Sequence, residues 1–435
     1  MTKDVFLFLC VGAAVLAKAT PAISNVEWSQ DPNTHKVTIT YDLTEGAIVT
    51  IDVCTNGTAS IGGEHLTSLA GAANRFVAAD EDHTVTWLVD RDWPGHHFAS
   101  GELTIALKAW TKDVPPDYLV VDLRMTNTVT CPTITYYADA AAIPEGVTND
   151  VYKTKKLIMR RVPAAGVAWR MGSPDGETGR TETSGVEPEH YVRFDNDYYV
   201  GIYPVTMGQY YQLCGQTPAN AMSGFNMDAV TNANAHPVGG ISYAYNSNDA
   251  SQSYLMRTDV WPSNRSWSLS NFKMGGFFVR LYGLSGIPFN LPTEAQWEFA
   301  CRAGTGSAFN SGKECTTAQN VACPNMDEVG WYSKNTATTQ PVGLKQANGW
   351  GLYDMHGNVY EWCLDWYGTI SGTASDLATE PGGATSNADK KRIRRGGGYS
   401  SSPKDCRSAS RGNAAASGNY VNNGFRLCCP VPVNW

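Results

Sequence analysis

Alternation of apolar and polar residues dominates the first quarter of the chain. The alternation is clearest over residues 37–43, 47–54, 83–90 and 103–110, where β-branched and aromatic side chains recur. A period of two is typical of a strand with one buried face. Short turns and glycine- and aspartate-rich breaks separate these runs, which indicates several short antiparallel strands. We therefore expect an all-β sandwich of immunoglobulin or fibronectin type over residues 20–112.

A junction is predicted at residues 113–156. Two strand-like runs, 118–123 and 133–138, follow a Pro-Pro pair, and turn residues around Pro144 break the chain afterwards. We place the start of the last domain near residue 150 and assign residues 157–435 to it.

The pattern changes after residue 155 to segments rich in Gly, Trp and Asn with few long periodic stretches. Two helices are predicted there. Thr206 begins one as its N-cap and Gly215 closes it, and Thr293 begins the other with Gln296 completing a capping box. Residues 246–272 are interpreted as an inserted loop. This part of the chain is predicted to be α+β.

An apolar run near the N-terminus predicts a signal peptide. Lys3 precedes the run at 5–17, which is too short to span a bilayer, and Ala17-Lys18-Ala19 is a small-residue cleavage site. A buried N-terminal strand or helix is the weaker interpretation because the cleavage chemistry follows immediately. We expect residues 1–19 to be removed and the protein to be secreted or periplasmic.

Composition narrows the function classes. The net charge is −8 and only 17% of the residues are charged, while Gly is abundant. No cluster of Lys and Arg resembles a phosphate-binding footprint, so nucleic acid is not an expected partner. No second apolar stretch is long enough for a transmembrane helix.

Cysteine content depends on the export prediction. Removal of Cys10 leaves ten of the eleven cysteines, an even number in a compartment where disulfides persist. The connectivity stays open. Cys315 and Cys323 are the easiest pair to propose because they bracket a short polar loop.

Seven motifs occur in a fixed order along the C-terminal two-thirds of the chain. They are MGSPDGETGR (171–180), YYVGIYPVTMGQYYQL (198–213), HPVGGISY (236–243), LPTEAQWEFACRAG (291–304), NGWGLYDMHGNVYEWCLDWY (348–367), RRGGGY (394–399) and NNGFRL (422–427). Together they resemble the formylglycine-generating enzyme (sulfatase-modifying factor) family over about residues 157–430. The resemblance implies a variant of the C-type-lectin fold, which agrees with the α+β prediction.

The resemblance also implies a copper site. Family oxidases convert a cysteine of a sulfatase peptide to formylglycine, with copper held by two cysteines five residues apart after the Gly-Gly motif. Here the later position is Cys406, but the earlier one is Ser401, which offers no thiolate for the soft Cu(I) ion. Gly398 and Tyr360 replace a Ser and a Trp of the family pattern. Copper is therefore not an expected cofactor, and Cys406 is catalytic only if the oxidase survives.

Two further features follow from the resemblance. Cysteines at the positions of Cys363 and Cys406 recur together in many bacterial members that lack the first copper cysteine, and we expect a disulfide between them that ties the two motifs together. Asp354, Gly357, Val359 and Glu361 match one calcium site of the family, with carboxylates and carbonyls as hard oxygen ligands. Calcium is accordingly the predicted cofactor.

The segment after the Gly-Gly motif is rich in Ser, Ala, Asn and Tyr. In the family fold it lies on the exposed face that forms the cleft of the oxidases, and some related domains are variable target proteins of diversity-generating retroelements. Aromatic anchors among small polar groups also resemble a paratope. The predicted binding face comprises Tyr399, Ser400, Ser402, Lys404, Asp405, Asn413, Asn419, Tyr420 and Asn422.

The sequence therefore predicts an exported, calcium-stabilised, non-catalytic module that binds or displays a protein, peptide or glycan ligand. The alternative is a formylglycine-generating oxidase, or a related oxidoreductase that acts on protein cysteine. A second thiol beside Cys406, such as Cys428 or Cys429, would favour the enzyme.

Overall fold

The computed structural model describes residues 20–55, 59–99, 101–111, 113–124, 134–215, 232–244, 254–256, 268, 270, 272–273, 275–370, 377–379, 383–384 and 388–431. The predicted signal peptide and most of the predicted insertion at 246–272 lie outside these residues. Within the described part of the chain, no helix has both the length and the apolar character needed to cross a membrane.

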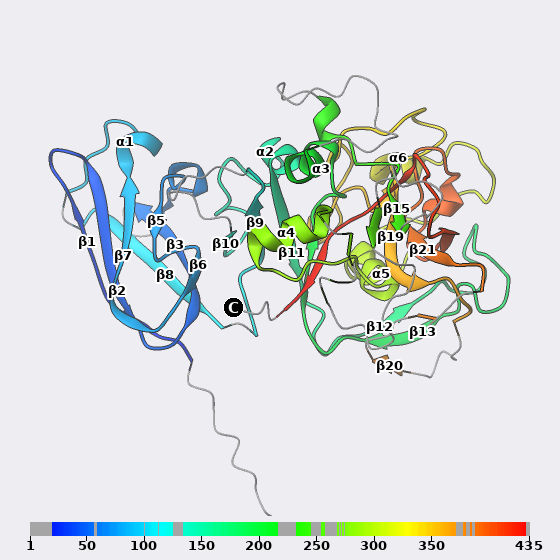
Figure 1. The fold of residues 1–435 in the computed structure, drawn as a ribbon, viewed down its shortest axis with the longest axis horizontal. Helices are drawn as coiled ribbons and strands as arrows, with labels where there is room; N and C mark the ends of the chain where they lie inside the picture. Colours follow the sequence, from blue (N-terminus) through cyan, green and yellow to red (C-terminus); the bar gives the residue numbers. More distant parts are fainter. Residues whose placement is uncertain are drawn as a thin grey trace, which may run out of the picture.

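Residues 20–111 form two antiparallel sheets around one core (Figure 1). The first sheet has the order β1 (Ile23–Gln30), β2 (Lys36–Leu43), β7 (Asp80–Leu88) and β5 (Ala70–Gly71). The second has the order β4 (Ala59–Ser60), β3 (Ala47–Thr55) and β6 (Arg75–Val77), with β8 (Leu103–Trp110) paired to β3. Alternation positions Val37, Ile39 and Tyr41 of β2 inward, at 1% exposure or less. The four strands predicted from periodicity are thus confirmed.

The predicted junction supplies two strands of the next sheet. This antiparallel sheet has the order β10 (Ile134–Tyr137), β9 (Tyr118–Asp122), β11 (Lys156–Val162), β14 (Tyr198–Gly201) and β24 (Cys428–Pro430). The first four residues of β9 are buried, and the strand pairs with β11 along one edge and with β10 along the other. The amide of Tyr136 in β10 also donates to the Asn74 carbonyl at 2.9 Å, which joins the two units.

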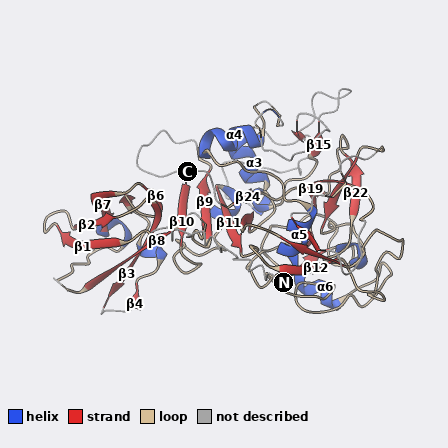
Figure 2. Ribbon diagram, turned by 90° about the horizontal axis from the view of Figure 1, so that it is seen from below, coloured by secondary structure: helices blue, strands red, loops and turns tan. Residues whose placement is uncertain are grey.

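Both predicted helices are confirmed. α3 (Met207–Cys214) begins after Thr206 and ends at the left-handed Gly215, and α5 (Glu294–Arg302) begins after Thr293. Each has the full capping box, which satisfies two free amides reciprocally. The sequence missed α4 (Phe277–Ser285), which has no side-chain N-cap bond and packs beside α3 (Figure 2). Its aromatic-rich surface is stabilised by the core rather than by local signals.

The remaining sheets belong to the C-terminal unit, and short helices occur in both units. The central sheet has the order β22 (Gly412–Ala415), β21 (Lys391–Arg395), β19 (Tyr360–Trp366) and β23 (Asn423–Gly424). Smaller sheets are β12 (Ala168–Met171) with β13 (His190–Arg193) and β20 (Leu377–Thr379), β15 (Ser242–Ala244) with β16 (Tyr254–Met256), and β17 (Gly330–Trp331) with β18 (His356–Gly357). Short helices are α1 (Val89–Asp92), α2 (Val151–Thr154), α6 (Pro324–Val329) and the 3₁₀ turns η1 (Gly63–His65), η2 (Asn232–Ala235) and η4 (Pro403–Cys406).

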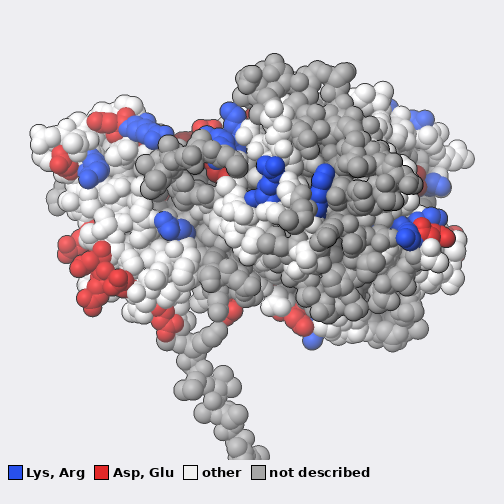
Figure 3. All heavy atoms as spheres, in the orientation of Figure 1, with Lys and Arg blue, Asp and Glu red and all other residues white. Residues whose placement is uncertain are grey.

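Among the described residues on the face drawn in Figure 3, Lys and Arg side chains are scattered singly or in small groups, and acidic side chains gather at the outer edge of the N-terminal unit.

Candidate functional site

The segment that would carry copper begins at a tight turn after β21. Gly396 and Gly397 have φ of 87° and 74°, a region that L side chains rarely adopt. A Cβ at Gly397 would lie 2.4 Å from the Sγ of Cys406, so the backbone approaches that thiol too closely for any other residue. The double glycine therefore lets the chain fold directly over Cys406.

Ser401 is committed to the backbone of this turn. Its hydroxyl accepts a hydrogen bond from the Gly398 amide at 2.9 Å, and its own amide donates to the Gly398 carbonyl at 2.9 Å. The Tyr360 side chain also interacts with Ser401. The position that offers a thiolate in the oxidases thus holds a hydroxyl that stabilises the turn.

Cys406 lies in a core cluster with two other cysteines, Cys315 and Cys323. All three are unbonded, and Cys315 is within hydrogen-bonding reach of Cys323. Burial raises the pKa of Cys406 well above its usual value and that of Cys315 to about 11, so both are neutral thiols near pH 7. A neutral thiol is a poor nucleophile and a poor copper ligand.

The predicted disulfide between Cys363 and Cys406 is wrong. Both are free thiols, and they belong to different core clusters. Cys363 lies on β19, whereas Cys406 ends the η4 turn. The thiols beside Cys406 are Cys315 and Cys323, and not Cys428 or Cys429, which lie on β24.

His356 contacts the backbone carbonyl of Cys406 and not its thiol. Its Nδ1–H donates to the Cys406 carbonyl at 2.7 Å, and its Nε2 accepts from the Asn310 amide at 3.0 Å. Burial lowers the pKa of His356 to about 4, so the ring is neutral and both nitrogens are occupied. It shapes the loop and is not placed as a general base.

The two carboxylates of the predicted calcium site each have partners within the protein. Glu361 is buried and receives Arg426 through Nη2 at 2.8 Å and Nε at 3.0 Å, while the Trp297 indole donates at 2.6 Å. Asp354 accepts from the Gly343 amide at 2.7 Å and from Asn358 at 3.1 Å. Burial raises the pKa of Asp354, an effect that these hydrogen bonds oppose.

The guanidinium therefore supplies the positive charge at Glu361, and a second cation there would be repelled. Gly357 and Val359 follow Asp354 in the same buried turn. Among the described residues, no group of three His, Cys, Asp or Glu is arranged to hold a metal ion. The predicted set has only two carboxylates beside its backbone carbonyls, and calcium binding stays a prediction.

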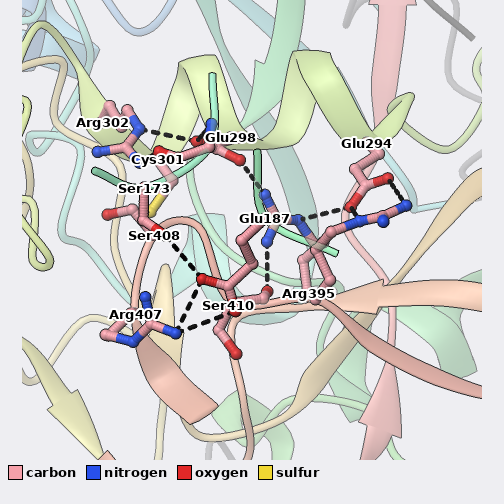
Figure 4. Close-up of polar contacts among 12 residues, drawn as sticks. Ser173, Glu187, Glu294, Glu298, Cys301, Arg302, Arg395, Arg407, Ser408 and Ser410 are labelled. Atoms are coloured by element: carbon pink, nitrogen blue, oxygen red, sulfur yellow. Dashed lines mark hydrogen bonds and ion pairs between the residues drawn. The ribbon is translucent and has the colours of Figure 1, made fainter. Parts of the chain in front are cut away.

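A network of buried ion pairs, which the sequence analysis missed, supports the whole segment (Figure 4). Arg395 reaches between Glu294 and Glu298, and Arg302 donates to Glu298 at 2.9 Å. Arg407 contacts Glu177 and donates to Glu187 at 3.0 Å, while the Ser173 hydroxyl donates to Glu187 at 2.9 Å. Arg395 belongs to the RRGGGY motif and Arg302 to LPTEAQWEFACRAG, and these motifs were the available signal.

A cavity of about 290 Å³ borders this network and is lined by His190, Glu294, Asp365 and Arg411 among others. Arg411 donates to both oxygens of Glu294, at 2.7 and 2.9 Å. Burial alone would raise the pKa of Glu294, but Arg411 and Arg395 outweigh it and lower the value. Glu294 is therefore a paired carboxylate and not a proton donor for a reaction in this cavity.

The predicted binding face divides into two groups. Ser402 donates to Asp405 at 2.6 Å, and Lys404 lies against Gly179, on a different loop. The other group contains Tyr399, Ser400, Tyr420 and Asn422. Asn422 donates to Ser400 at 3.4 Å, and Tyr420 is 40% exposed. Asn413 lies on β22 opposite Ile393, and Asn419 is half-buried.

Comparison with known proteins places this geometry in a family. Residues 155–430 match the sulfatase-modifying factor enzyme 1-like domain. The chain therefore belongs to the formylglycine-generating enzyme (sulfatase-modifying factor) family, as the ordered motifs implied.

The relatives of the chain include a formylglycine-generating enzyme and a protein kinase. The chain is 35% identical over 145 residues to the formylglycine-generating enzyme of Streptomyces coelicolor, covering 31% of this chain and 45% of that protein. It is 37% identical over 142 residues to the serine/threonine-protein kinase pkn1 of Chlamydia caviae, covering 31% and 20%. The matched segments span less than half the length of these relatives.

Similar solved structures cover a larger share of the chain. Treponema denticola variable protein 1 is 22% identical with a TM-score of 0.44, covering 63% of this chain and 95% of that one. PvdO from Pseudomonas aeruginosa is 24% identical with a TM-score of 0.43, covering 63% and 94%.

Proposed function

We propose that this protein is an exported, non-catalytic binding module, whose face around Tyr399, Ser400, Tyr420 and Asn422 takes a peptide or protein ligand. The observation that carries the proposal is the state of the copper position. Ser401 offers a hydroxyl that is already bonded to Gly398, and Cys406 is a fully buried, neutral thiol. A Cu(I) site needs two thiolates in reach of one ion.

Composition of the exposed group supports binding. Tyr420 and Val421 are exposed, at 40% and 52%, beside the hydroxyl of Ser400 and the amide of Asn422. Aromatic side chains that lose little entropy, surrounded by small hydrogen-bonding groups, are typical of recognition surfaces. We further propose that residues 1–19 direct export and that the N-terminal unit is an immunoglobulin- or fibronectin-type sandwich that presents the family domain.

The test is a copper and turnover measurement on the purified mature protein. We expect no stoichiometric Cu(I) binding and no oxidation of a cysteine-containing sulfatase peptide in aerobic, reducing buffer. Ser401→Cys is the matched gain-of-ligand variant, and Ser400→Cys places the same thiol one residue away as its control. Turnover by the unaltered protein would overturn the proposal.

One observation favours the oxidase as a second candidate. Cys315 and Cys323 lie beside Cys406, so a thiol pair is available without position 401. In that case Cys323→Ser and Cys315→Ser should each abolish copper binding, whereas Ser401→Ala should not change it. Copper loading that survives all three changes would exclude this arrangement.

A further inference from the structure

Arg394 on β21 differs from four other arginines of this domain in its partners. Arg395, Arg407, Arg411 and Arg426 each meet at least one buried Glu. For Arg407, burial lowers the pKa, but Glu187 and Glu177 outweigh it and raise the value. Arg394, next to Arg395, makes no ion pair with any carboxylate in the described part of the chain, and burial lowers its pKa.

Arg394 lies between two tyrosine rings on the exposed face. Its guanidinium carbon is 4.0 Å from the ring centre of Tyr360 and 5.7 Å from that of Tyr420. Glycines make room for both rings. A Cβ at Gly412 would lie 3.0 Å from the Tyr360 ring, and one at Gly418 would lie 2.2 Å from the Tyr420 ring. The backbone is thus shaped around this arrangement.

The guanidinium keeps donors for a ligand. Nη1 donates to the Asn423 side-chain oxygen at 2.8 Å, which fixes the plane of the group. Nη2 has no hydrogen-bond partner among the described residues and is not sealed from solvent. An oriented cation with a free donor on a binding surface is prepared for a planar anion, since the ordering cost is already met.

We propose that Arg394, held between Tyr360 and Tyr420, binds one carboxylate of an acidic side chain on a peptide or protein ligand. The proposal rests on the binding function proposed above and names the ligand chemistry. A single planar cation suits a single carboxylate, because guanidinium and carboxylate match as a fork. A phosphate dianion would need more positive charge than this site offers, in a chain of net charge −8.

A polypeptide ligand is favoured by the surroundings of the cation. Val421, at 52% exposure, adds an apolar surface next to Tyr420, and Ser400 and Asn422 offer hydrogen bonds to a backbone. This combination fits alternate acidic and apolar side chains of an extended peptide. The Asp405 carboxylate interacts electrostatically with Arg394. This negative charge near the cation also disfavours a second negative charge on the ligand.

The experiment probes the full mature protein with an array of capped random-sequence peptides. A best binder is then resynthesised with Glu, Gln or phosphoserine at its acidic position, and 3′-sialyllactose is tested separately. We expect Asp or Glu in the retained peptides and a loss of roughly tenfold or more when Glu becomes Gln. Arg394→Gln should cause the same loss, and the two changes together should cost no more than either alone.

Controls separate this site from a general charge effect. Lys334→Gln removes one exposed positive charge outside the predicted face and should leave affinity within about twofold, because its contribution is screened by solvent. Arg394→Lys keeps the charge but not the fork and should restore only part of the binding. Melting temperatures of the variants check that each is folded.

Several outcomes would overturn the proposal. Peptides retained without acidic residues, or additive losses in the two-change cycle, would refute the carboxylate site. If Tyr420→Ala abolishes the binding of those peptides, the proposed binding function stands and only the carboxylate site is refuted. Stronger binding of the phosphoserine peptide, or binding of 3′-sialyllactose with no peptide retained, would refute the ligand class. Retention of no peptide and no glycan would refute both proposals.

Discussion

Arg394 and Arg395 are neighbours on β21 with opposite surroundings. Arg395 is fully buried between Glu294 and Glu298, while Arg394 lies between two tyrosines with a donor left over. Alternation along a strand sends successive side chains to opposite faces of the sheet. The same residue type thus stabilises the domain at one position and is available for recognition at the next.

The comparison shows why the family frame does not depend on the residues at the copper position. The ion pairs around Arg395, Arg407 and Arg426 fix the segment that follows the Gly-Gly turn. Ser401 and Tyr360 differ from the family pattern only in the side chains at and beside the copper position. A substitution that breaks a buried ion-pair network strongly lowers the free energy of unfolding, whereas most surface substitutions change it little.

The largest expected effect separates the two arginines directly. Arg395→Met should lower the free energy of unfolding of the C-terminal unit by about 3–5 kcal/mol, because it leaves buried carboxylates short of a partner. Arg394→Met should cost about 1 kcal/mol, since it removes a half-buried cation–π contact but breaks no ion pair among the described residues. Thermal and urea denaturation of the two variants measures the difference. Equal losses would remove the distinction.

A second prediction concerns acid stability of the buried network. Arg411 and Arg395 hold the pKa of Glu294 below its usual value despite burial. A depressed carboxyl contributes stability above the unfolded pKa of about 4.5, and that stability is lost as pH falls through the lower folded value. Glu294→Gln should therefore be less stable than the native protein near pH 7 and should lose less on acidification. Parallel slopes from pH 6 to pH 3 would contradict this role.

A smaller effect on stability is expected from oxidation of the buried thiols near Cys406. Oxidation should join Cys315 to Cys323, which already contact each other, and stabilise the short loop by about 2 kcal/mol. Peptide mapping without reductant should recover these two cysteines linked, with Cys406 alkylated as a free thiol. Cys323→Ser should abolish the gain. Recovery of Cys363 linked to Cys406 would show that the thiol arrangement is different.

The smallest effect is expected from calcium. Arg426 already neutralises Glu361, so chelation should leave the melting temperature of the native protein unchanged. Glu361→Gln should lower that temperature, because it leaves Arg426 buried without its partner. A native melting temperature that falls with chelator and recovers with calcium, more than with magnesium, would support the calcium site that the motif predicts.

Local signals made much of the fold predictable. The strands over residues 37–43 and 103–110 follow from alternation, and the helices after Thr206 and Thr293 follow from capping boxes, because these features involve neighbours in the chain. α4 was missed because its apolar face is justified only by the core that covers it. Strands β9 and β10 were found, but their membership in the second sheet depends on pairing with β11.

The sequence by itself determined the family, through seven ordered motifs, and it determined that Ser401 cannot supply a thiolate to copper. Only the tertiary structure decided which groups meet: Arg426 at Glu361, Cys315 and Cys323 beside Cys406, and Arg394 against Tyr360 with no ion-paired carboxylate among the described residues. The reason is physical. Residue chemistry is a local property, whereas charge compensation and thiol pairing depend on contacts between residues far apart in the chain, such as the 65 positions that separate Glu361 from Arg426.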